Sequence, residues 1–279
     1  MNPMHLTSAG LPSASGSACA DLRTLDAWFT SLALAAGACE FEAPPLIAVQ
    51  DLQSVGYFGA FPHHVNLVAP INKPTLQRIA ADSKRTSSIP KDKNLDHPQH
   101  AFTPAACYLL YPRQRGRKLD HDELWTLVSS CCRNEEMYQA GIRQQVFRMR
   151  EIVFLGQAES ALKFVTLWRE RISSLLKEIG LQCTVEVATD PFFRDDDPRR
   201  PMQKLQQNKL EFRWRGELAV ASLNFHNNFF GEAFDIKEAE GRPAFSACVA
   251  FGLERWAFAC REQFGSNWIH RFHPENEQV

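Results

Sequence analysis

Two helices with one apolar face stand out in the spacing of hydrophobic residues along the chain. In residues 22–34 apolar side chains recur at helical spacing, and the pattern stops near Gly37. A second apolar stripe covers about residues 158–179, and Gly180 follows where helices commonly end in the left-handed conformation. A third helix is predicted near the C-terminus, in the segment GLERWAFACREQF.

Alternation of apolar and polar residues predicts strands between the last two helices. It appears in residues 183–187, in residues 210–214 and in the segment LAVASLNFH. Upstream, Pro44 and Pro45 end the helical pattern and favour an extended segment, since proline removes a backbone donor. Helices that are spread unevenly among strands, without an internal repeat, favour an α+β domain over a regular βαβ array.

Two further segments have the composition of connections. Residues 1–20 are rich in Ser, Ala and Gly without periodicity, which predicts a mobile leader before a single domain over residues 21–279. Residues 81–104 are polar, charged and interrupted by prolines, which predicts a long exposed connection.

Composition and charge exclude several classes of protein. The 279 residues are 44% hydrophobic and 23% charged, an ordinary globular balance that excludes disordered and fibrous chains. The 31 basic and 32 acidic residues nearly cancel, so no overall positive field favours a nucleic-acid partner. No apolar run approaches the roughly 20 residues of a membrane span, and the first residues lack the pattern of a signal peptide. We therefore expect a cytoplasmic protein without a membrane partner.

The eight cysteines are spaced irregularly, which does not suggest a disulfide framework. Reduced thiols are the expectation, and any special cysteine is a candidate for metal binding or redox chemistry. The chain has no CxxC or HExxH motif. The pairs His63–His64 and His97–His100 lie in predicted loops, where a structural role is the ordinary interpretation.

The central stretch SSCCRNEEMYQAGIRQQVFRMREIVFLG concentrates arginines and glutamates around Phe147. A solvated charged face is the ordinary interpretation of such a run. However, LVSSCC and IVFLG on either side are strand-like, and two strands joined by a loop would bring their arginine-bearing ends together. Arginine suits phosphates, because its planar fork donates two parallel hydrogen bonds. Near the C-terminus FGLER places Glu254 and Arg255 at a helix start, where a salt bridge would be ordinary.

Taken in order, ACYLLYP, CCRNE, FRMREIVFLG, ATDPFF, KLEF, SLNFH and FGLER resemble the amino acid:[carrier protein] ligases, small relatives of the atypical zinc-dependent seryl-tRNA synthetases. CCRNE with FRMRE and FGLER look like motifs 2 and 3 of class II aminoacyl-tRNA synthetases, and EAPPLI looks like motif 1. The resemblance runs from about Glu40 to the last helix. It implies a class II synthetase-like catalytic domain, with an antiparallel sheet flanked by helices, and a homodimer formed through motif 1.

The resemblance also implies a nucleotide site. Arg133 would hold the α-phosphate of ATP, Glu135 would contact adenine, Phe147 would lie below the base and Arg255 above it. Arg133 and Arg255 would be the catalytic residues. A fixed cation lowers the barrier where charge develops on phosphate, and arginine stacks favourably on a π-face.

A zinc site is implied by three separated positions. Cys107 in ACYLLYP, Glu151 in FRMRE and Cys248 in ACVAFGLER match the family's two cysteines and one glutamate. Three protein ligands leave a fourth tetrahedral position open, as in catalytic zinc sites. In the family the amino group of the substrate takes that position, and glycine or alanine is the usual substrate. Cys131 and Cys132 are expected to be structural.

Three residues of SLNFH remain open. Ser222, Asn224 and His226 are candidates for ATP, Mg²⁺ or substrate contacts, with His226 on the substrate side, and a structural role is the alternative. After them the family usually carries an acidic residue and a second histidine, whereas this chain has residues 227–230 as NNFF. The change puts magnesium binding or the shape of the amino acid pocket in question.

The activity implied is two-step: an amino acid reacts with ATP to an aminoacyl-adenylate, then passes to the phosphopantetheine thiol of a small carrier protein. One rival is a reduced seryl-tRNA synthetase. About 20 residues between the leader and motif 1 are too few for a long two-helix tRNA-binding arm, so no tRNA partner is expected. The other rival is a non-catalytic paralogue that binds nucleotide or amino acid, which the NNFF segment would favour.

Overall fold

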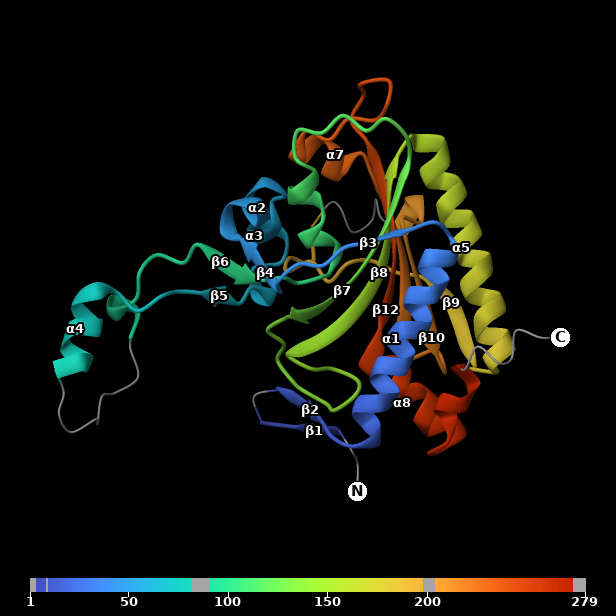
Figure 1. The fold of residues 1–279 in the computed structure, drawn as a ribbon, viewed down its shortest axis with the longest axis horizontal. Helices are drawn as coiled ribbons and strands as arrows, with labels where there is room; N and C mark the ends of the chain where they lie inside the picture. The colour runs from blue at the N-terminus through green and yellow to red at the C-terminus, as the bar shows by residue number, and fades with distance from the viewer. Residues whose placement is uncertain (1–3, 9, 82–90, 198–203, 273–279) are drawn as a thin grey trace.

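A seven-stranded sheet forms the centre of the protein in the computed structural model, which describes residues 4–8, 10–81, 91–197 and 204–272 (Figure 1). The strand order is β3-β7-β8-β12-β11-β10-β9. Neighbouring strands are antiparallel except for β3 and β7, which are parallel. The predicted α+β class with an antiparallel sheet is confirmed, with this one parallel pair at the edge. The strands are β3 Cys39–Glu40, β7 Glu123–Cys132, β8 Val146–Gly156, β9 Cys183–Val187, β10 Lys209–Trp214, β11 Leu218–Asn227 and β12 Phe245–Gly252.

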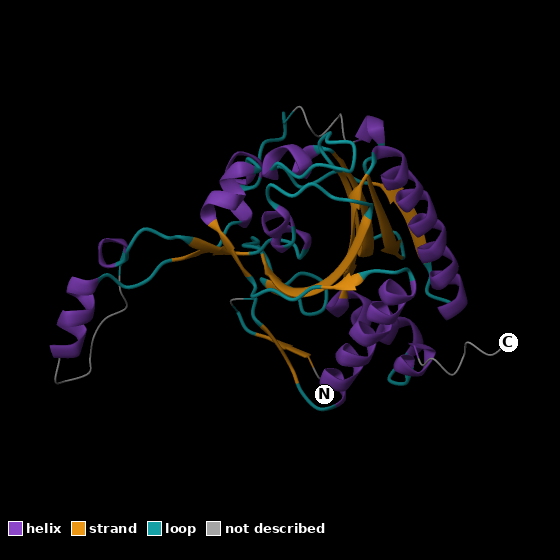
Figure 2. Ribbon diagram, turned by 45° about the horizontal axis from the view of Figure 1, so that its top comes forward, coloured by secondary structure: helices purple, strands orange, loops and turns teal. Residues whose placement is uncertain are grey.

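Three long helices cover one face of this sheet (Figure 2). They are α1 Ser17–Ala35, α5 Ala158–Ile179 and α8 Leu253–Phe264, followed by the 3₁₀ helix η5 Trp268–Phe272. Their apolar stripes meet the sheet in the larger of two hydrophobic cores, where the ring of Phe29 stacks on that of Phe251 with centroids 4.0 Å apart. The predicted helix over residues 158–179 is confirmed, including Gly180 at its end with φ 75°.

Short elements cover the opposite face and form the second core. The three-stranded sheet β4-β6-β5 lies here with several short helices, and their arrangement leaves space above the large sheet that becomes the candidate site. The elements are β4 Leu46–Ala48, β5 Leu67–Val68, β6 His100–Phe102, α2 Val49–Ser54, α3 Tyr57–Ala60, η1 Pro62–His64, η3 Cys107–Leu109, η4 Tyr111–Gln114 and α7 Phe229–Phe234.

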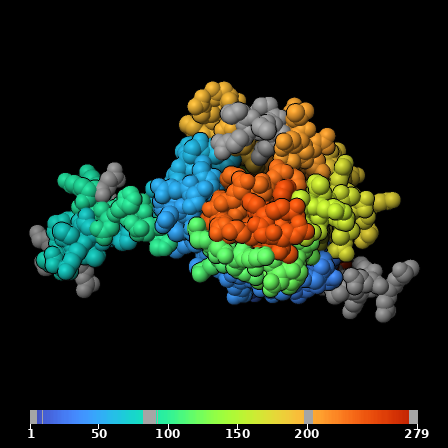
Figure 3. All heavy atoms as spheres, turned by 90° about the horizontal axis from the view of Figure 1, so that it is seen from above, coloured from blue at the N-terminus to red at the C-terminus, as the bar shows by residue number. Residues whose placement is uncertain are grey.

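An arm that carries α4 Lys73–Ala81 projects from this side of the body (Figure 3). The predicted exposed connection over residues 81–104 falls partly on residues 82–90, which lie outside the described part. The described part of that stretch contains η2 Asp92–Asn94 and β6. None of the described helices is both long and apolar enough to cross a bilayer.

The N-terminal segment differs from the expected leader over residues 1–20. The described residues include β1 Met4–Leu6, which pairs antiparallel with β2 Pro12–Ala14, and α1 begins at Ser17. The apolar spacing indicates a helix only from Leu22, because the first turn, SACA, has small side chains, of which only Ala18 is buried, and gives no apolar periodicity. Residues 1–3 and 9 lie outside the described part.

One buried ion pair joins α1 to the sheet. Arg150 on β8 is only 3% exposed, and its Nε and Nη2 donate to the two carboxylate oxygens of Asp26 on α1 at 2.8 and 2.9 Å. Glu40 on β3 adds a longer contact at 3.4 Å. A buried arginine must keep its carboxylate partner, because an unpaired charge is costly to bury.

Asp26→Asn should therefore lower the free energy of unfolding by about 1–3 kcal/mol, since it leaves the Arg150 charge with one distant partner. Glu40→Gln is the matched control: the Glu40 side chain is 49% exposed, so its loss should change stability by less than about 0.5 kcal/mol. Urea unfolding measures both. Equal effects of the two substitutions would contradict this assignment.

Candidate functional site

The register of the sheet brings side chains from three neighbouring strands together on one face. In one row Glu151 on β8 lies opposite Ala250 on β12, which lies opposite Ser222 on β11. In the next row Cys248 on β12 lies opposite Asn224 on β11. Since residues two apart on a strand share a face, these side chains all point away from α1, α5 and α8. The alternation that builds the core thus also builds the floor of a site.

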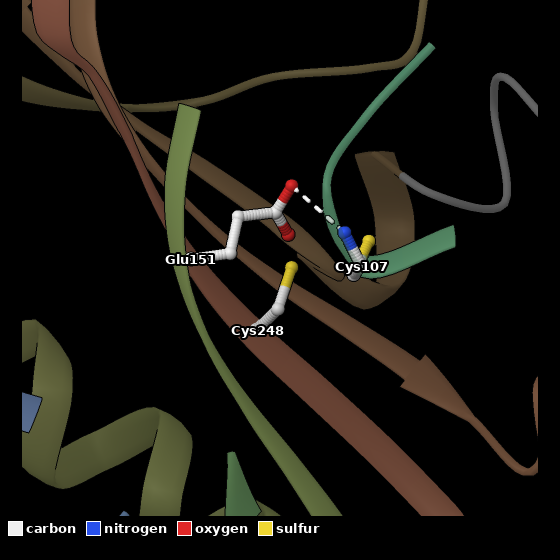
Figure 4. Close-up of side chains that lie close together, drawn as sticks. All are labelled: Cys107, Glu151 and Cys248. Atoms are coloured by element: carbon white, nitrogen blue, oxygen red, sulfur yellow. Dashed lines mark hydrogen bonds between the residues drawn. The ribbon is translucent and has the colours of Figure 1, made fainter. Parts of the chain in front are cut away.

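Cys107 reaches this floor from the opposite layer. The backbone N–H groups of Ala106 and Cys107 donate to Glu151 Oε1 at 2.8 and 3.2 Å, which fixes the start of η3 over the sheet. The side chains of Cys107, Glu151 and Cys248 point toward one another (Figure 4), and their potential ligand atoms lie within 4.8 Å of one another. All three residues are buried. Within the described residues this is the one group of His, Cys, Asp or Glu side chains found with metal-ligand spacing.

Burial and the hydrogen bond between the two thiols shape the electrostatics of this trio. Burial raises the pKa of Glu151, although hydrogen bonds from Cys107 and Ala106 oppose it. The hydrogen bond to Cys248, together with burial, raises the pKa of Cys107. Three buried groups that prefer to be neutral become ligands when a cation compensates their charge. Two thiolates and one carboxylate fit zinc, which accepts sulfur and oxygen donors in a tetrahedral arrangement.

A cavity of about 380 Å³ lies over the trio. Its aromatic side is formed by Tyr57, Tyr108 and Phe230, whose rings contact one another and their neighbours edge to face or stacked. Phe230 is fixed from behind by Tyr111, with ring centroids 3.8 Å apart. This side of the cavity is therefore aromatic, and its rings are held in place by contacts with one another.

A second cavity of about 130 Å³ adjoins the first and contains the residues predicted to bind adenine. Glu135, Phe147 and Arg255 line it. Arg133 borders both cavities, together with Met149, Lys209, Ser222 and Ala250. Arg133 Nε donates to Pro104 O at 2.9 Å, and its guanidinium lies 5.2 Å from the centre of the Phe147 ring. Arg133 therefore stands between the two cavities.

Arg255 is held firmly at the wall of the second cavity. Its Nε donates to Ile142 O at 2.8 Å and its Nη1 to Ala219 O at 3.1 Å. Burial, helped by the nearby Arg133, lowers the pKa of Arg255 to about 10, so it stays charged at neutral pH. The cation found against the Phe147 ring is Arg133, so the predicted stack of Arg255 over adenine remains a prediction. Its neighbour Glu254, at the start of α8, forms a salt bridge with Arg148 at 3.0 Å, which is the ordinary role considered for this position.

The three open candidates on β11 surround the trio. The Asn224 amide is 3.4 Å from Cys248 Sγ, and it donates to Ser222 Oγ at 3.3 Å. His226 Nε2 lies 3.8 Å from Cys248 Sγ, and its Nδ1 lies 3.3 Å from both Tyr111 Oη and Ser246 Oγ. Burial lowers the pKa of His226 to about 4, so its ring is neutral at physiological pH.

The segment after His226 forms part of the cavity wall. A bulge separates Phe225 from Asn227, and Asn227 adopts the left-handed conformation with φ 53°. The chain then enters α7, which places Phe230 against Tyr111. The NNFF sequence thus contributes an aromatic ring to this side of the first cavity.

The sequence interpretation missed two charged residues of the first cavity. Lys209 on β10 and Asp190 both line it, with Lys209 Nζ 2.8 Å from Asp190 Oδ1. The signal was present in KLEF, because buried Leu210 and Phe212 leave Lys209 and Glu211 on the other face. This alternation places Lys209 in the cavity only when the strands that pair with β10 are known, and the sequence alone does not give that pairing. His64, expected to be structural, is buried and also lines this cavity.

His64 should make stability pH-dependent. Burial, with the charges of Arg133 and His63, lowers its pKa from 6.5 to about 3. Below about pH 6.5 the unfolded chain therefore binds a proton that the folded protein does not, and stability falls as the pH decreases toward 3. His64→Phe should show a smaller loss of melting temperature between pH 7 and pH 5. An equal loss in both proteins would contradict this.

Comparisons with known proteins add the family context. No family model matches the chain. Amino acid–[acyl-carrier-protein] ligase 1 from Bradyrhizobium diazoefficiens is 32% identical over 239 residues, and the match covers 83% of this chain and 73% of that protein. Type-2 serine–tRNA ligase from Methanopyrus kandleri is 24% identical over 259 residues, covering 83% of this chain and 48% of that protein.

A solved structure shows the same fold. M. kandleri SerRS, in its complex with A. aeolicus tRNASec, superposes with a TM-score of 0.79 at 20% identity, over 98% of this chain and 58% of that one. The predicted class II aminoacyl-tRNA synthetase-like fold is thereby confirmed.

Proposed function

Because the chain belongs to the amino acid–[acyl-carrier-protein] ligase family, we propose that it activates a small amino acid with ATP and transfers it to the phosphopantetheine thiol of a carrier protein. The observation that carries this proposal is the position of Arg133 between two adjoining cavities. One cavity contains the Cys107–Glu151–Cys248 trio, and the other contains Glu135, Phe147 and Arg255. An amino acid in the first and a nucleotide in the second would meet at the Arg133 guanidinium.

The first step is attack of the amino acid carboxylate on the α-phosphorus of ATP. A carboxylate oxygen forms the new P–O bond, the bond to the β-phosphate breaks, and pyrophosphate leaves. Arg133 stabilises the charge that develops on the α-phosphate, and Phe147 and Arg255 hold the base. Magnesium accompanies ATP, and Glu211, which lines the second cavity, is a candidate to hold it.

The second step is attack of the carrier thiolate on the carbonyl of the aminoacyl-adenylate. A C–S bond forms, the bond to the phosphate oxygen breaks, and AMP leaves. Cys107, Glu151 and Cys248 would hold a zinc ion, which when bound supplies a Lewis acid for the unprotonated amino group of the substrate. His226, neutral and close to Cys248, lies on the amino acid side.

The apolar wall supports a small substrate. Tyr108 and Phe230 face the cavity that contains the trio, and the Tyr111–Phe230 stack keeps the wall in place. Glycine or alanine, the usual substrate that the resemblance implies, is the substrate we propose. We also propose that the protein acts as a homodimer through the segment that contains β4, which light scattering tests directly.

Metal analysis tests the zinc site. The purified protein should contain about one zinc per chain, and Cys107→Ala or Cys248→Ala should weaken zinc binding at least about 100-fold, because each removes one of three ligands. Cys131→Ala is the matched control: Cys131 is equally buried on the neighbouring strand β7 but lies outside the trio. Thermal melts of all variants check folding. Full zinc occupancy in Cys107→Ala would exclude the proposed site.

Pyrophosphate exchange tests the activity. With MgATP and a panel of amino acids, we expect exchange mainly with glycine or alanine, and Arg133→Ala should reduce it by about 100-fold or more because charge stabilisation is lost. Radiolabelled amino acid should then pass to a carrier protein that carries phosphopantetheine, and not to its apo form or to tRNA. Absence of exchange with every amino acid would indicate the non-catalytic paralogue, whereas transfer to tRNA would indicate a synthetase.

A further inference from the structure

We propose that the N-terminal hairpin, made of β1, β2 and Gly10 between them, is a positioning element for ATP. It would hold the loop of residues 133–145, here called the nucleotide loop, against the second cavity. The inference rests on the proposed function insofar as that cavity binds ATP. Residues 4–14 lie outside the sequence motifs that indicated the nucleotide site.

The backbone of Gly10 lies close against the ring of Tyr138. A Cβ atom at this position would lie 2.5 Å from Cγ and Cδ1 of Tyr138 and 2.7 Å from Cδ2, distances that real Cβ atoms do not show. The φ of Gly10 is also 74°, in the left-handed region that favours glycine. Gly10 therefore packs directly against the ring of Tyr138, which lies in the middle of the nucleotide loop.

The base of the loop is held by the same residue. Gly10 O accepts a hydrogen bond from Gln145 N at 2.9 Å, and Gln145 O accepts one from Arg133 N at 2.9 Å. Gln145 thus uses both backbone groups, one toward the hairpin and one toward Arg133. The hairpin is therefore hydrogen-bonded to Gln145, which in turn closes the nucleotide loop by its bond from Arg133.

Tyr138 links the hairpin to the second cavity through a hydrogen bond with Glu135. Its hydroxyl accepts a hydrogen bond from Glu135 N at 3.4 Å, and the Glu135 carboxylate lies 3.5 Å from Arg143 Nη1. Glu135 and Arg143 both line the second cavity. A displaced Tyr138 ring would therefore move the two charged side chains that face the nucleotide, whereas the Cys107–Glu151–Cys248 trio is held by separate contacts.

Gly16 supplies a matched control for the experiment. It has a similar left-handed φ of 56°, but a Cβ added there would meet no atom within 4 Å. Gly10→Ala and Gly16→Ala both introduce a side chain at a positive φ, Gly16 with ψ −128°, and only Gly10→Ala pushes on Tyr138. Thermal melts of the two variants report their folding.

ATP binding is the readout, measured by calorimetry and as KM in the exchange assay. We expect Gly10→Ala to raise the Kd and KM for ATP about tenfold while the KM for the amino acid changes less than about twofold. Gly16→Ala should change neither. Tyr138→Phe, which keeps the ring and removes only the hydroxyl, should raise the Kd for ATP by a smaller factor of about three.

A double variant tests whether Gly10→Ala weakens ATP binding through the Tyr138 ring. Tyr138→Ala removes the ring that the new Cβ meets, so Gly10→Ala should add little to the Kd for ATP in that background. Additive effects, equal weakening by Gly16→Ala, or an equal rise in the amino acid KM would overturn the proposal, as would a failure of the unaltered protein to bind ATP. Because ATP binding is measured directly, the proposal can hold where no exchange is found, and it can fail while exchange proceeds normally.

Discussion

The carboxylate of Glu151 is the point on which the organisation of the site depends. It is buried on β8, an inner strand of the large sheet, and two backbone N–H groups from the opposite layer converge on one of its oxygens. A buried carboxylate is tolerated only where such donors, or a cation, replace its lost hydration. The same bonds that satisfy Glu151 therefore fix Cys107 over the sheet, next to Cys248. The contacts that pack the two layers together therefore also bring the three side chains of the trio together.

The two faces of the sheet have different roles: one forms a hydrophobic core and the other lines the candidate site. On one face large rings such as Phe29 and Phe251 fill a dry core against the helices, which makes the strands rigid. On the other face the same strands carry charged and polar side chains across two adjoining cavities. Arg150, on β8 next to Glu151, points to the helix side and is neutralised by Asp26, whereas Arg133 borders the cavities. The two arginines thus differ in role because Arg150 lies on the helix-facing side of β8, whereas Arg133 follows the end of β7 beside the cavities.

The sequence predicted more of the fold than of the contacts within the site. Periodicity located α5 and α8, and alternation located β9, β10 and β11, because these elements bury one regular face. The start of α1 and the hairpin before it were missed, since small residues such as Ala18 leave no periodic signal. Similarly, the ion pair of Lys209 with Asp190 depends on strand pairing, which one-dimensional spacing does not contain. The positions of Cys107, Glu151 and Cys248 came from the ordered motifs, and only the folded chain shows that they lie together.

The NNFF segment shows why a departure from a motif need not mean decay. An acidic residue and a histidine are expected there, and their loss alone would suggest a site that no longer works. In the structure Phe230 packs on Tyr111, and the hydroxyl of Tyr111 lies 3.3 Å from His226, which in turn borders Cys248. The aromatic pair therefore helps to hold a side chain next to the trio. The departure thus coexists with an assembled trio, and it places Phe230 in the aromatic wall beside it.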